Sequence, residues 1–524
     1  MTNYLSATTL FFVTASVTAP LQARQSTELG TVEFSNSCAP ASQQALNEAI
    51  AVLHSFWHDE AVRRFTQLTE SDEACAIAYW GLAMSHAHIA GPRPPADALA
   101  LGRSAVAHAM TLENMTSRER GFLQAASEIF EESGDWRQRH EDQMARMHEA
   151  YPEDVEVTLF YVLALIASID TGDRTYAKQE EAGALAERVF AEQPNHPGAA
   201  HYIIHSYDFP PLASQALAAA NHYADIAPTI SHALHMPTHI FSSLGMWRES
   251  IAHNIRSRRA AQRVDDAMME SHALTYSVYA HLQRGADTEA QGQLALLSAL
   301  AETRPAPAVT AHLASAEAVY TLERRAWQEA ADIDLSPAIR QTPRAVAFSA
   351  SARALGAARA HDIAQAREGI EYLEQVIDDP TAWRPDRLTI WGAVASAWLS
   401  VAEGDEARAI DHMARAVELE KHSMYIGSVT PIPDVLVRVE EQRGDLMMEL
   451  ERYDEALAAF ELSLAASPRR FNTLYAAGRA AELAGRAQLA RRYFTRLLEL
   501  TAGAESARPE LAYARKVLAG NELP

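Results

Sequence analysis

Apolar residues along this chain recur every three to four positions, a period typical of amphipathic α-helices. The pattern is clearest in two segments, "GDLMMELERYDEALAAFELSLAASP" from Gly444 and "GRAAELAGRAQLARRYFTRLLEL" from Gly478. In both, small residues stand where two helices must approach closely, and a phenylalanine stands where a large side chain fills the space to the next pair. Three landmarks repeat at a spacing of 34 residues: Gly444 and Gly478, Ala456 and Ala490, and Phe460 and Phe494. These segments predict two consecutive helix pairs.

Weaker copies of the helix pair cover most of the remaining chain. A turn followed by an alanine recurs at spacings of 36 to 43 residues, at Ala290, Ala330, Ala366 and Ala409. No sustained alternation with a period of two and no Asn-Gly hairpin is present, so strands are not expected. The sequence therefore predicts an all-α solenoid of roughly 12 to 14 helix pairs with one continuous core. The first helix of each pair would line a long concave surface.

The C-terminal segments resemble the tetratricopeptide repeat (TPR), a helix-turn-helix unit of 34 residues. The match consists of a glycine at unit position 8, an alanine at 20, an aromatic at 24 and, in the first unit, Pro468 at 32. This resemblance implies a right-handed TPR-like α-solenoid that binds a protein or peptide in its groove. The blocks "LHSFWHDEAVRRF…ACAIAYWGLAMSHAH" and "HPGAAHYIIHSYD…HALHMPTHIF" also resemble a bacterial exported TPR subgroup of unassigned function.

Four segments are expected along the chain. Residues 1–23 resemble a signal peptide with cleavage after Ala23, the alternative being a buried first helix. Degenerate repeats would follow over 24–421, then an insertion rich in turn residues over 422–434, then regular repeats and a capping helix over 435–524. No other apolar run reaches 18 residues, so no membrane span is expected. The predicted location is periplasmic or secreted.

Charge and cysteine content narrow the partners and the compartment. The net charge of −23 argues against nucleic acid, because a phosphate backbone requires clustered Lys and Arg. Cys38 and Cys75 are the two cysteines, and in an exported protein such a pair suggests a disulfide. Two separate small apolar residues are the alternative, because the sequence does not show that the cysteines meet.

Histidines are concentrated in the middle of the chain. Seven of the 21 lie within 44 residues: His196, His201, His205, His222, His232, His235 and His239. His201 and His205, like His235 and His239, are spaced i, i+4, so each pair lies on one helix face and could chelate a metal ion. An imidazole-only ligand set favours Zn²⁺ or copper. The candidate ligands are His201, His205, His235 and His239, with His232 and His54 as further candidates.

The TPR resemblance places most of these histidines on the groove wall. In the family register, His232, His235 and His239 take groove positions 2, 5 and 9 of one unit. The same register assigns four further residues to the groove: His272, His312, Tyr279 and His86. Histidine stands where peptide-binding TPR domains carry the Lys and Arg that clamp a carboxylate, so that ligand mode is not expected here. Pro237 should break or kink the helix within this cluster, which fits a site better than a plain wall.

Two functions therefore remain open from sequence. The first is an exported TPR protein that binds a protein, peptide or small-molecule partner in a His-lined groove. The second is a Zn- or Cu-binding protein, or a metalloenzyme, with the histidine cluster as ligands. Standard catalytic and nucleotide-binding motifs are absent from the sequence, so any enzyme activity would depend on a metal. Asp208 could orient an imidazole from behind.

Overall fold

The computed structural model describes residues 28–91, 93–131, 134–170, 172–422 and 436–520. The predicted signal peptide lies outside these ranges, as does almost all of the predicted insertion. Within them, no helix combines the length and the apolar character needed to cross a bilayer.

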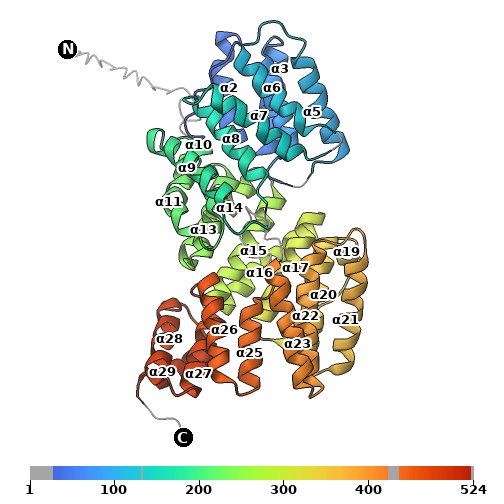
Figure 1. The fold of residues 1–524 in the computed structure, drawn as a ribbon, viewed down its shortest axis with the longest axis vertical. Helices are drawn as coiled ribbons and strands as arrows, with labels where there is room; N and C mark the ends of the chain where they lie inside the picture. Colours follow the sequence, from blue (N-terminus) through green and yellow to red (C-terminus); the bar gives the residue numbers. More distant parts are fainter. Residues whose placement is uncertain (1–27, 92, 132–133, 171, 423–435, 521–524) are drawn as a thin grey trace, which may run out of the picture.

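The first half of the protein is a succession of helices joined by short turns (Figure 1). Its α-helices are α2 (Gln43–His54), α3 (His58–Ser71), α4 (Ala76–Ala87), α5 (Ala96–Ala109), α6 (Ser117–Ile129), α7 (Trp136–Ala150), α8 (Val155–Ala167), α9 (Ala177–Glu192), α10 (Pro197–Tyr207), α11 (Leu217–Ile226), α12 (Ser231–His235) and α13 (Pro237–Ser243). Two short 3₁₀ helices accompany them, η1 (Pro40–Ser42) and η2 (Ala213–Ala216).

The second half continues in the same way. Its α-helices are α14 (Trp247–Arg263), α15 (Ala267–Gln283), α16 (Asp287–Thr303), α17 (Pro307–Glu323), α18 (Trp327–Ala331), α19 (Pro337–Arg340), α20 (Pro343–Arg359), α21 (Ile363–Asp378), α22 (Pro385–Ala402), α23 (Glu406–His422), α25 (Val439–Glu449), α26 (Tyr453–Ala466), α27 (Phe471–Leu483), α28 (Ala487–Leu500) and α29 (Pro509–Leu518).

Local sequence signals set many of these boundaries. Thr116 and Glu119 form a capping box at the start of α6, and the Asp154 and Asp266 side chains cap α8 and α15. Gly285 turns the chain between α15 and α16 with φ of +67°, a conformation that glycine adopts without steric cost. Residues at the helix ends therefore fix these boundaries.

Glycine and phenylalanine pack the helix pairs together as the 34-residue landmarks predict. A Cβ atom added to Gly444 would lie 2.4 Å from the Phe460 ring, and one added to Gly478 would lie 2.6 Å from the Phe494 ring. Gly81 and Phe65 make the same kind of contact in the first half, at 2.1 Å. The all-α fold of sequential helix pairs is thus confirmed, with close packing at the predicted small residues.

Two hydrophobic cores divide the molecule into two lobes (Figure 1). One core runs from Leu29 to Phe241, and the other runs from Trp247 to Ala514. We call these the N-lobe and the C-lobe. The C-terminal repeats over 435–524 share a core with the helices from α14 onward. The boundary near residue 246 falls beside the histidine-rich segment, so this segment lies at the junction of the lobes.

The N-lobe closes on itself. Helix α2 contacts α4, two helices further along the chain, and also α10, much later in the sequence. The segment before α2 also pairs with the N-lobe's end, because the Thr31 N–H donates to the Asn195 carbonyl at 2.9 Å. The aromatic rings of Phe34, Trp80 and Phe122 fill the space inside.

The C-lobe closes in the same manner through a buried ionic network. Helix α27 returns to contact α15, and Arg470 forms ion pairs with Glu323 at 2.8 Å and Glu441 at 3.1 Å. The Phe471 N–H donates to Gln283 at 3.1 Å. The sequence predicted one continuous core beside a long concave surface, and the structure instead has two cores in two lobes that each close on themselves.

Candidate metal centre

The first histidine pair lies on α10, whose start is fixed by two residues. Pro197 occupies the first helical position, where its missing N–H removes no helical hydrogen bond. His196 caps the helix because its Nδ1 accepts the Gly198 N–H at 3.1 Å. His201 and His205 follow one turn apart on one face and are 0% and 6% exposed.

The second pair spans the helix break that Pro237 was expected to cause. Helix α12 ends at His235, and α13 begins at Pro237, which has no N–H to donate. Met236 between them keeps right-handed helical angles, with φ of −51° and ψ of −38°. His232 and His235 therefore occupy a helical turn of their own, and His239 still follows on the same face.

Three imidazoles meet in a group that we call site 1: His201, His205 and His232. Nε2 of His201 lies 3.0 Å from Nε2 of His205 and 3.2 Å from Nε2 of His232. Two nitrogens bound to one tetrahedral ion at ~2.0–2.1 Å would lie roughly 3.3–3.4 Å apart. The nitrogens of site 1 are thus close to the separation that a shared metal ion requires.

The surroundings of His201 fix its tautomer. Its Nδ1 donates to the backbone carbonyl of His54 at 2.6 Å, and a carbonyl can only accept. The neutral ring therefore carries its lone pair on Nε2, the atom that faces the other two histidines. A backbone carbonyl behind a metal-binding imidazole is a common outer support, because it sets the ring's tautomer and orientation.

A second trio, site 2, consists of His235, His239 and His272. Nε2 of His235 lies 3.2 Å from Nε2 of His239, and the rings of His235 and His272 have centroids 4.4 Å apart. His272 comes from α15 in the C-lobe, so site 2 joins the two lobes. The Tyr276 hydroxyl lies 3.5 Å from Nε2 of His239, at the edge of the site.

Both imidazoles at the centre of site 2 direct lone pairs toward each other. His239 donates its Nδ1–H to the Asp208 carboxylate at 2.8 Å, as the sequence suggested for Asp208. His235 donates its Nδ1–H to the Asn254 side-chain oxygen at 2.8 Å, because the Asn254 amide nitrogen donates to the Ser250 carbonyl. In the neutral rings neither Nε2 then carries a proton. Two facing lone pairs at this distance repel unless a cation or a proton lies between them.

Burial keeps four of the six site imidazoles neutral. It lowers the pKa of His201, His232, His235 and His272 well below 6.5, and neighbouring histidines lower the pKa of each one further. A shared proton between two rings would place a positive charge where burial disfavours it. Neutral imidazole is the form that binds a metal ion, so the sites are prepared for ligation at neutral pH.

The four main candidate ligands fall into two groups rather than one. The sequence grouped His201 and His205 with His235 and His239 around one ion. The structure gives each pair its own third histidine because α12 lies between the pairs and faces both. His232 and His235 are three residues apart on this helix, and the charges of His235 and His239 influence the pKa of His232. The two sites are therefore neighbours.

His54 supports site 1 instead of contributing its ring to it. Its Nδ1 accepts the Tyr202 hydroxyl at 2.9 Å, and its Nε2–H donates to Glu156 at 2.9 Å. His196 donates its Nε2–H to the other Glu156 oxygen at 3.1 Å. We call His54, Glu156 and His196 the carboxylate triad. All three are buried, and each polar atom has a partner, so the ring of His54 is committed elsewhere.

The remaining groove candidates lie in three different places. His312 packs against His272 with ring centroids 5.1 Å apart, and its Nδ1 lies 2.7 Å from the Ser271 hydroxyl. Tyr279 is buried in the C-lobe network, where its hydroxyl contacts Arg470. His86 lies in the last turn of α4 and belongs to neither trio. The predicted groove wall is therefore not one surface.

Cys38 and Cys75 are joined in a disulfide. The bond ties the segment before α2 to the start of α4. Asp72 lies close to both sulfurs, but sulfurs that are bonded to each other do not serve as thiolate ligands.

One supporting residue, Phe56, was missed from sequence because its role depends on backbone shape. Phe56 has φ of 53°, a left-handed conformation that is uncommon for a bulky residue. This turn ends α2 at His54 and starts α3 at His58, so these two histidines do not share a helix although they are four residues apart. The Phe56 ring instead packs on His201 of site 1, with ring centroids 4.5 Å apart. In the sequence, only the Phe56-Trp57 pair between two histidines hints at this contact.

Comparison with known proteins gives no family. No family model and no curated protein matches the chain. Among solved structures, the human IFIT1 dimer with m7Gppp-AAAA is similar at 14% identity and a TM-score of 0.37, over 87% of this chain and 89% of that one. The APC/C hetero-tetramer Cut9–Hcn1 is similar at 10% identity and a TM-score of 0.33, over 91% and 89%. The all-α array of helix pairs is therefore established by the helices of this structure and not by these similarities.

Proposed function

We propose that this protein binds two late transition-metal ions, one in each three-histidine site. The proposal rests mainly on site 2, where the Nε2 atoms of His235 and His239 face each other 3.2 Å apart. Their Nδ1–H groups already donate to Asn254 and Asp208, so both Nε2 atoms present lone pairs. Site 1 repeats the arrangement with the His54 carbonyl behind His201. A metal ion in each site would replace the repulsion between facing lone pairs with bonds to three imidazoles.

The ligand chemistry favours zinc or copper. The close donor atoms are imidazole nitrogens, and Mg²⁺ and Ca²⁺ prefer oxygen ligands. Three protein ligands leave a coordination position open, which is the pattern of catalytic rather than structural sites. We therefore extend the proposal to a metal-dependent enzyme or ligand carrier, in which each ion would bind a small exogenous ligand.

Metal analysis of untagged protein tests this function. Protein purified without a His tag should hold about two ions of zinc or copper per chain, and His239→Ala should lose the ion of site 2. His108→Ala is the matched control, since His108 is an exposed histidine on α5. Wild-type protein that stays free of metal in excess zinc and in excess copper would rule out the function.

We also propose an exported location. The disulfide between Cys38 and Cys75 supports it, because such bonds persist in oxidising compartments. The signal-like residues 1–23 agree with this location. Fractionation of the native host should place the mature protein outside the cytoplasm.

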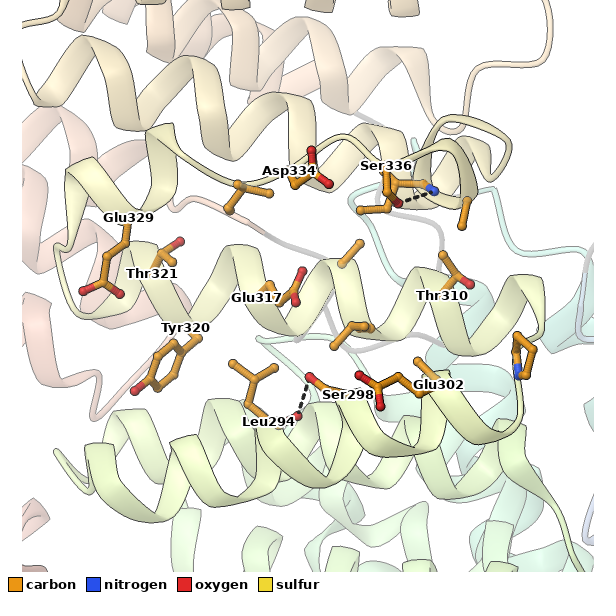
Figure 2. Close-up of a pocket in the computed structure, with 17 residues that line it drawn as sticks. Leu294, Ser298, Glu302, Thr310, Glu317, Tyr320, Thr321, Glu329, Asp334 and Ser336 are labelled. Carbon is orange, nitrogen blue, oxygen red and sulfur yellow. Dashed lines mark hydrogen bonds between the residues drawn. The ribbon is translucent and has the colours of Figure 1, made fainter.

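A second candidate function is supported by a cavity in the C-lobe. The cavity has a volume of about 670 Å³ and lies among α16, α17 and α19 (Figure 2). Figure 2 shows the carboxylates of Glu302, Glu317 and Asp334 on its walls, between apolar side chains. In the described ranges, no ion pair joins these three to a basic side chain. Burial is the larger cause that raises the pKa of Glu317, and the charge of Asp334 is the smaller one. A bound cation would therefore stabilise the ionised carboxylate.

The lining of this cavity would suit a partner segment with basic and apolar side chains, so the second candidate function is partner binding in the cavity rather than at the histidines. Binding of an amphipathic Lys/Leu peptide should weaken several-fold in Glu317→Gln. The control is Glu289→Gln, which removes an exposed charge on α16 outside the cavity. Equal affinity in both variants would exclude the cavity as the binding site.

A further inference from the structure

A hydroxyl group lies beside the imidazole nitrogens of site 2. Tyr276 is 1% exposed, and its hydroxyl oxygen lies 3.5 Å from Nε2 of His239. Its ring contacts all three histidines of the site, with centroids 4.7 Å from His235, 5.4 Å from His239 and 5.1 Å from His272. Tyr276 is therefore part of the wall of site 2, although it is not one of the three histidines that define the site.

Helix α15 places Tyr276 on the most open side of site 2. Tyr276 follows His272 by four residues, so the two side chains lie on one face of this helix. His272 is partly exposed, whereas His235 and His239 are 0% and 5% exposed. A small molecule would therefore approach an ion in site 2 from the side of α15, which also carries the hydroxyl.

The tautomer of His239 sets the direction of its contact with Tyr276. Because the Nδ1–H of His239 donates to Asp208 at 2.8 Å, its Nε2 carries a lone pair. The Tyr276 O–H is therefore the donor in this contact, and at 3.5 Å the hydrogen bond is weak. A metal ion bound to Nε2 would take up the same lone pair. The hydroxyl would then face the coordination sphere of the ion.

Site 1 presents a different group to a bound ion. The ring that contacts all three of its histidines belongs to Phe56, with centroids 4.5 to 5.8 Å away. The nearby Tyr202 hydroxyl donates to His54 at 2.9 Å and is thereby used in the carboxylate triad. The two sites thus differ beside their imidazoles, with a hydroxyl in site 2 and a hydrocarbon ring in site 1.

The charge near the open side of site 2 favours an anion. Burial and the neighbouring histidines lower the pKa of His272, and the positive charge of Arg344 lowers it further. A positive charge that disfavours a protonated imidazole favours a negatively charged ligand in the same place. The Asp208 carboxylate opposes this effect, but the ring of His239 separates it from the position of the ion.

We propose that Tyr276 positions the exogenous ligand of site 2, by donating its hydroxyl hydrogen to a small anion bound at the open coordination position of the ion. The inference rests on the proposed metal-binding function. The ligand class is an anion that binds the ion through one atom and accepts a hydrogen bond, such as a carboxylate or azide. Site 1, which has a phenyl ring instead, would hold the same anion without this hydrogen bond.

Azide binding to copper-loaded protein tests this role in the full chain. Protein with two Cu²⁺ ions per chain is titrated with azide, and the absorption of the copper–azide complex is followed. Tyr276→Phe keeps the ring and removes the hydroxyl. One of the two azide-binding ions should therefore lose about 10- to 100-fold in azide affinity, the contribution of a hydrogen bond to a charged group. The other ion should keep its affinity, and the copper content should stay at two ions per chain.

Tyr161→Phe is the matched control, because the Tyr161 hydroxyl donates to Glu181 and belongs to neither trio. It should bind azide as the wild-type protein does, and an equal loss in this variant would overturn the proposed role of Tyr276.

The outcomes separate this role from the proposed function. Wild-type azide affinity in Tyr276→Phe, at full copper content, would overturn the positioning role and leave metal binding standing. A Tyr276→Phe protein that holds fewer than two copper ions would also overturn it, because Tyr276 would then be a ligand of the ion or a residue that the fold requires. Wild-type protein that binds neither copper nor zinc would refute the proposed function, and the positioning role with it.

Discussion

The carboxylate triad and site 2 contain the same kind of side chains but differ in how their protons are arranged. Both are buried, and both bring imidazole nitrogens close together. In the triad, the Nε2–H groups of His54 and His196 point at the two oxygens of Glu156. In site 2, the Nε2 atoms of His235 and His239 point at each other, 3.2 Å apart. In the triad, the carboxylate accepts both N–H groups, so every polar atom has a partner. In site 2, two lone pairs face each other, and an added cation would satisfy both.

The direction of the imidazole protons thus distinguishes a structural cluster from a candidate binding site. Neither burial nor the number of histidines makes this distinction. Site 2 also has its carboxylate, Asp208, but this residue takes the outer Nδ1–H of His239. The inner nitrogen is thereby left for a ligand. The carboxylate triad has the hydrogen bonding of a structural cluster. Sites 1 and 2 contain the same residue types but orient their imidazole nitrogens toward one another.

Acid should produce the largest effect, and it acts on the imidazoles of sites 1 and 2. The pKa values of His201, His232, His235 and His272 lie well below 6.5 in the folded protein, whereas unfolded histidine titrates near 6.5. Below pH 6.5 the unfolded chain therefore binds more protons, and the free energy of unfolding falls as pH falls. At pH 5.5 the loss is up to about 1.4 kcal/mol for each imidazole that stays neutral. Urea unfolding of metal-free protein at pH 7.5 and 5.5 measures it.

A stability that is equal at the two pH values would show that the imidazoles are not held neutral. It would also remove the reason for expecting metal binding at neutral pH. Metal should increase the pH dependence, because protons compete with it for Nε2.

Glu156→Gln should break the carboxylate triad. The amide presents a donor to one of the two imidazole N–H groups, so a buried polar group loses its partner. We expect a loss of about 3 kcal/mol in the free energy of unfolding, in metal-free and metal-loaded protein alike. In contrast, His272→Ala in site 2 should cost about 1 kcal/mol or less in metal-free protein, because its ring is partly exposed. Urea midpoints measure both.

The comparison fails if the two variants are equally destabilised without metal. Site 2 would then be a structural cluster like the triad. A metal-dependent difference that appears in His272→Ala but not in Glu156→Gln would sharpen the distinction.

Asp208→Asn should have the smallest effect on folding and a selective effect on metal. The amide can no longer hold His239 as a carboxylate does, so the affinity of site 2 should fall roughly 10–100-fold, while site 1 is unchanged. Competition with a chelator of known affinity measures this. The control is Asp225→Asn, an exposed carboxylate on α11's last turn. Equal losses at both sites would contradict separate sites.

The sequence predicted what depends on local spacing. The 34-residue landmarks predicted the close contacts of Gly444 with Phe460, and the i, i+4 spacing predicted that His201 and His205 share a face. It could not predict which histidine would complete each pair, because His232 and His272 arrive from other helices. That choice depends on how the helix pairs curl into two lobes.

Backbone conformation accounts for the other differences. The left-handed Phe56 ends a helix between His54 and His58, and an i, i+4 count assumes that the helix continues. The tautomers of site 2 depend on Asn254, which is on α14 and 15 residues beyond His239 in sequence. Neither feature has a local sequence signal.

Anomalous diffraction from crystals loaded with zinc or copper tests the central claim most directly. The account predicts two peaks, one at ~2.0–2.1 Å from the Nε2 atoms of site 1 and one at the same distance from those of site 2. It also predicts that the Asp208 and Asn254 hydrogen bonds remain. No peak at either trio, or peaks only at other histidines such as His108, would contradict the account.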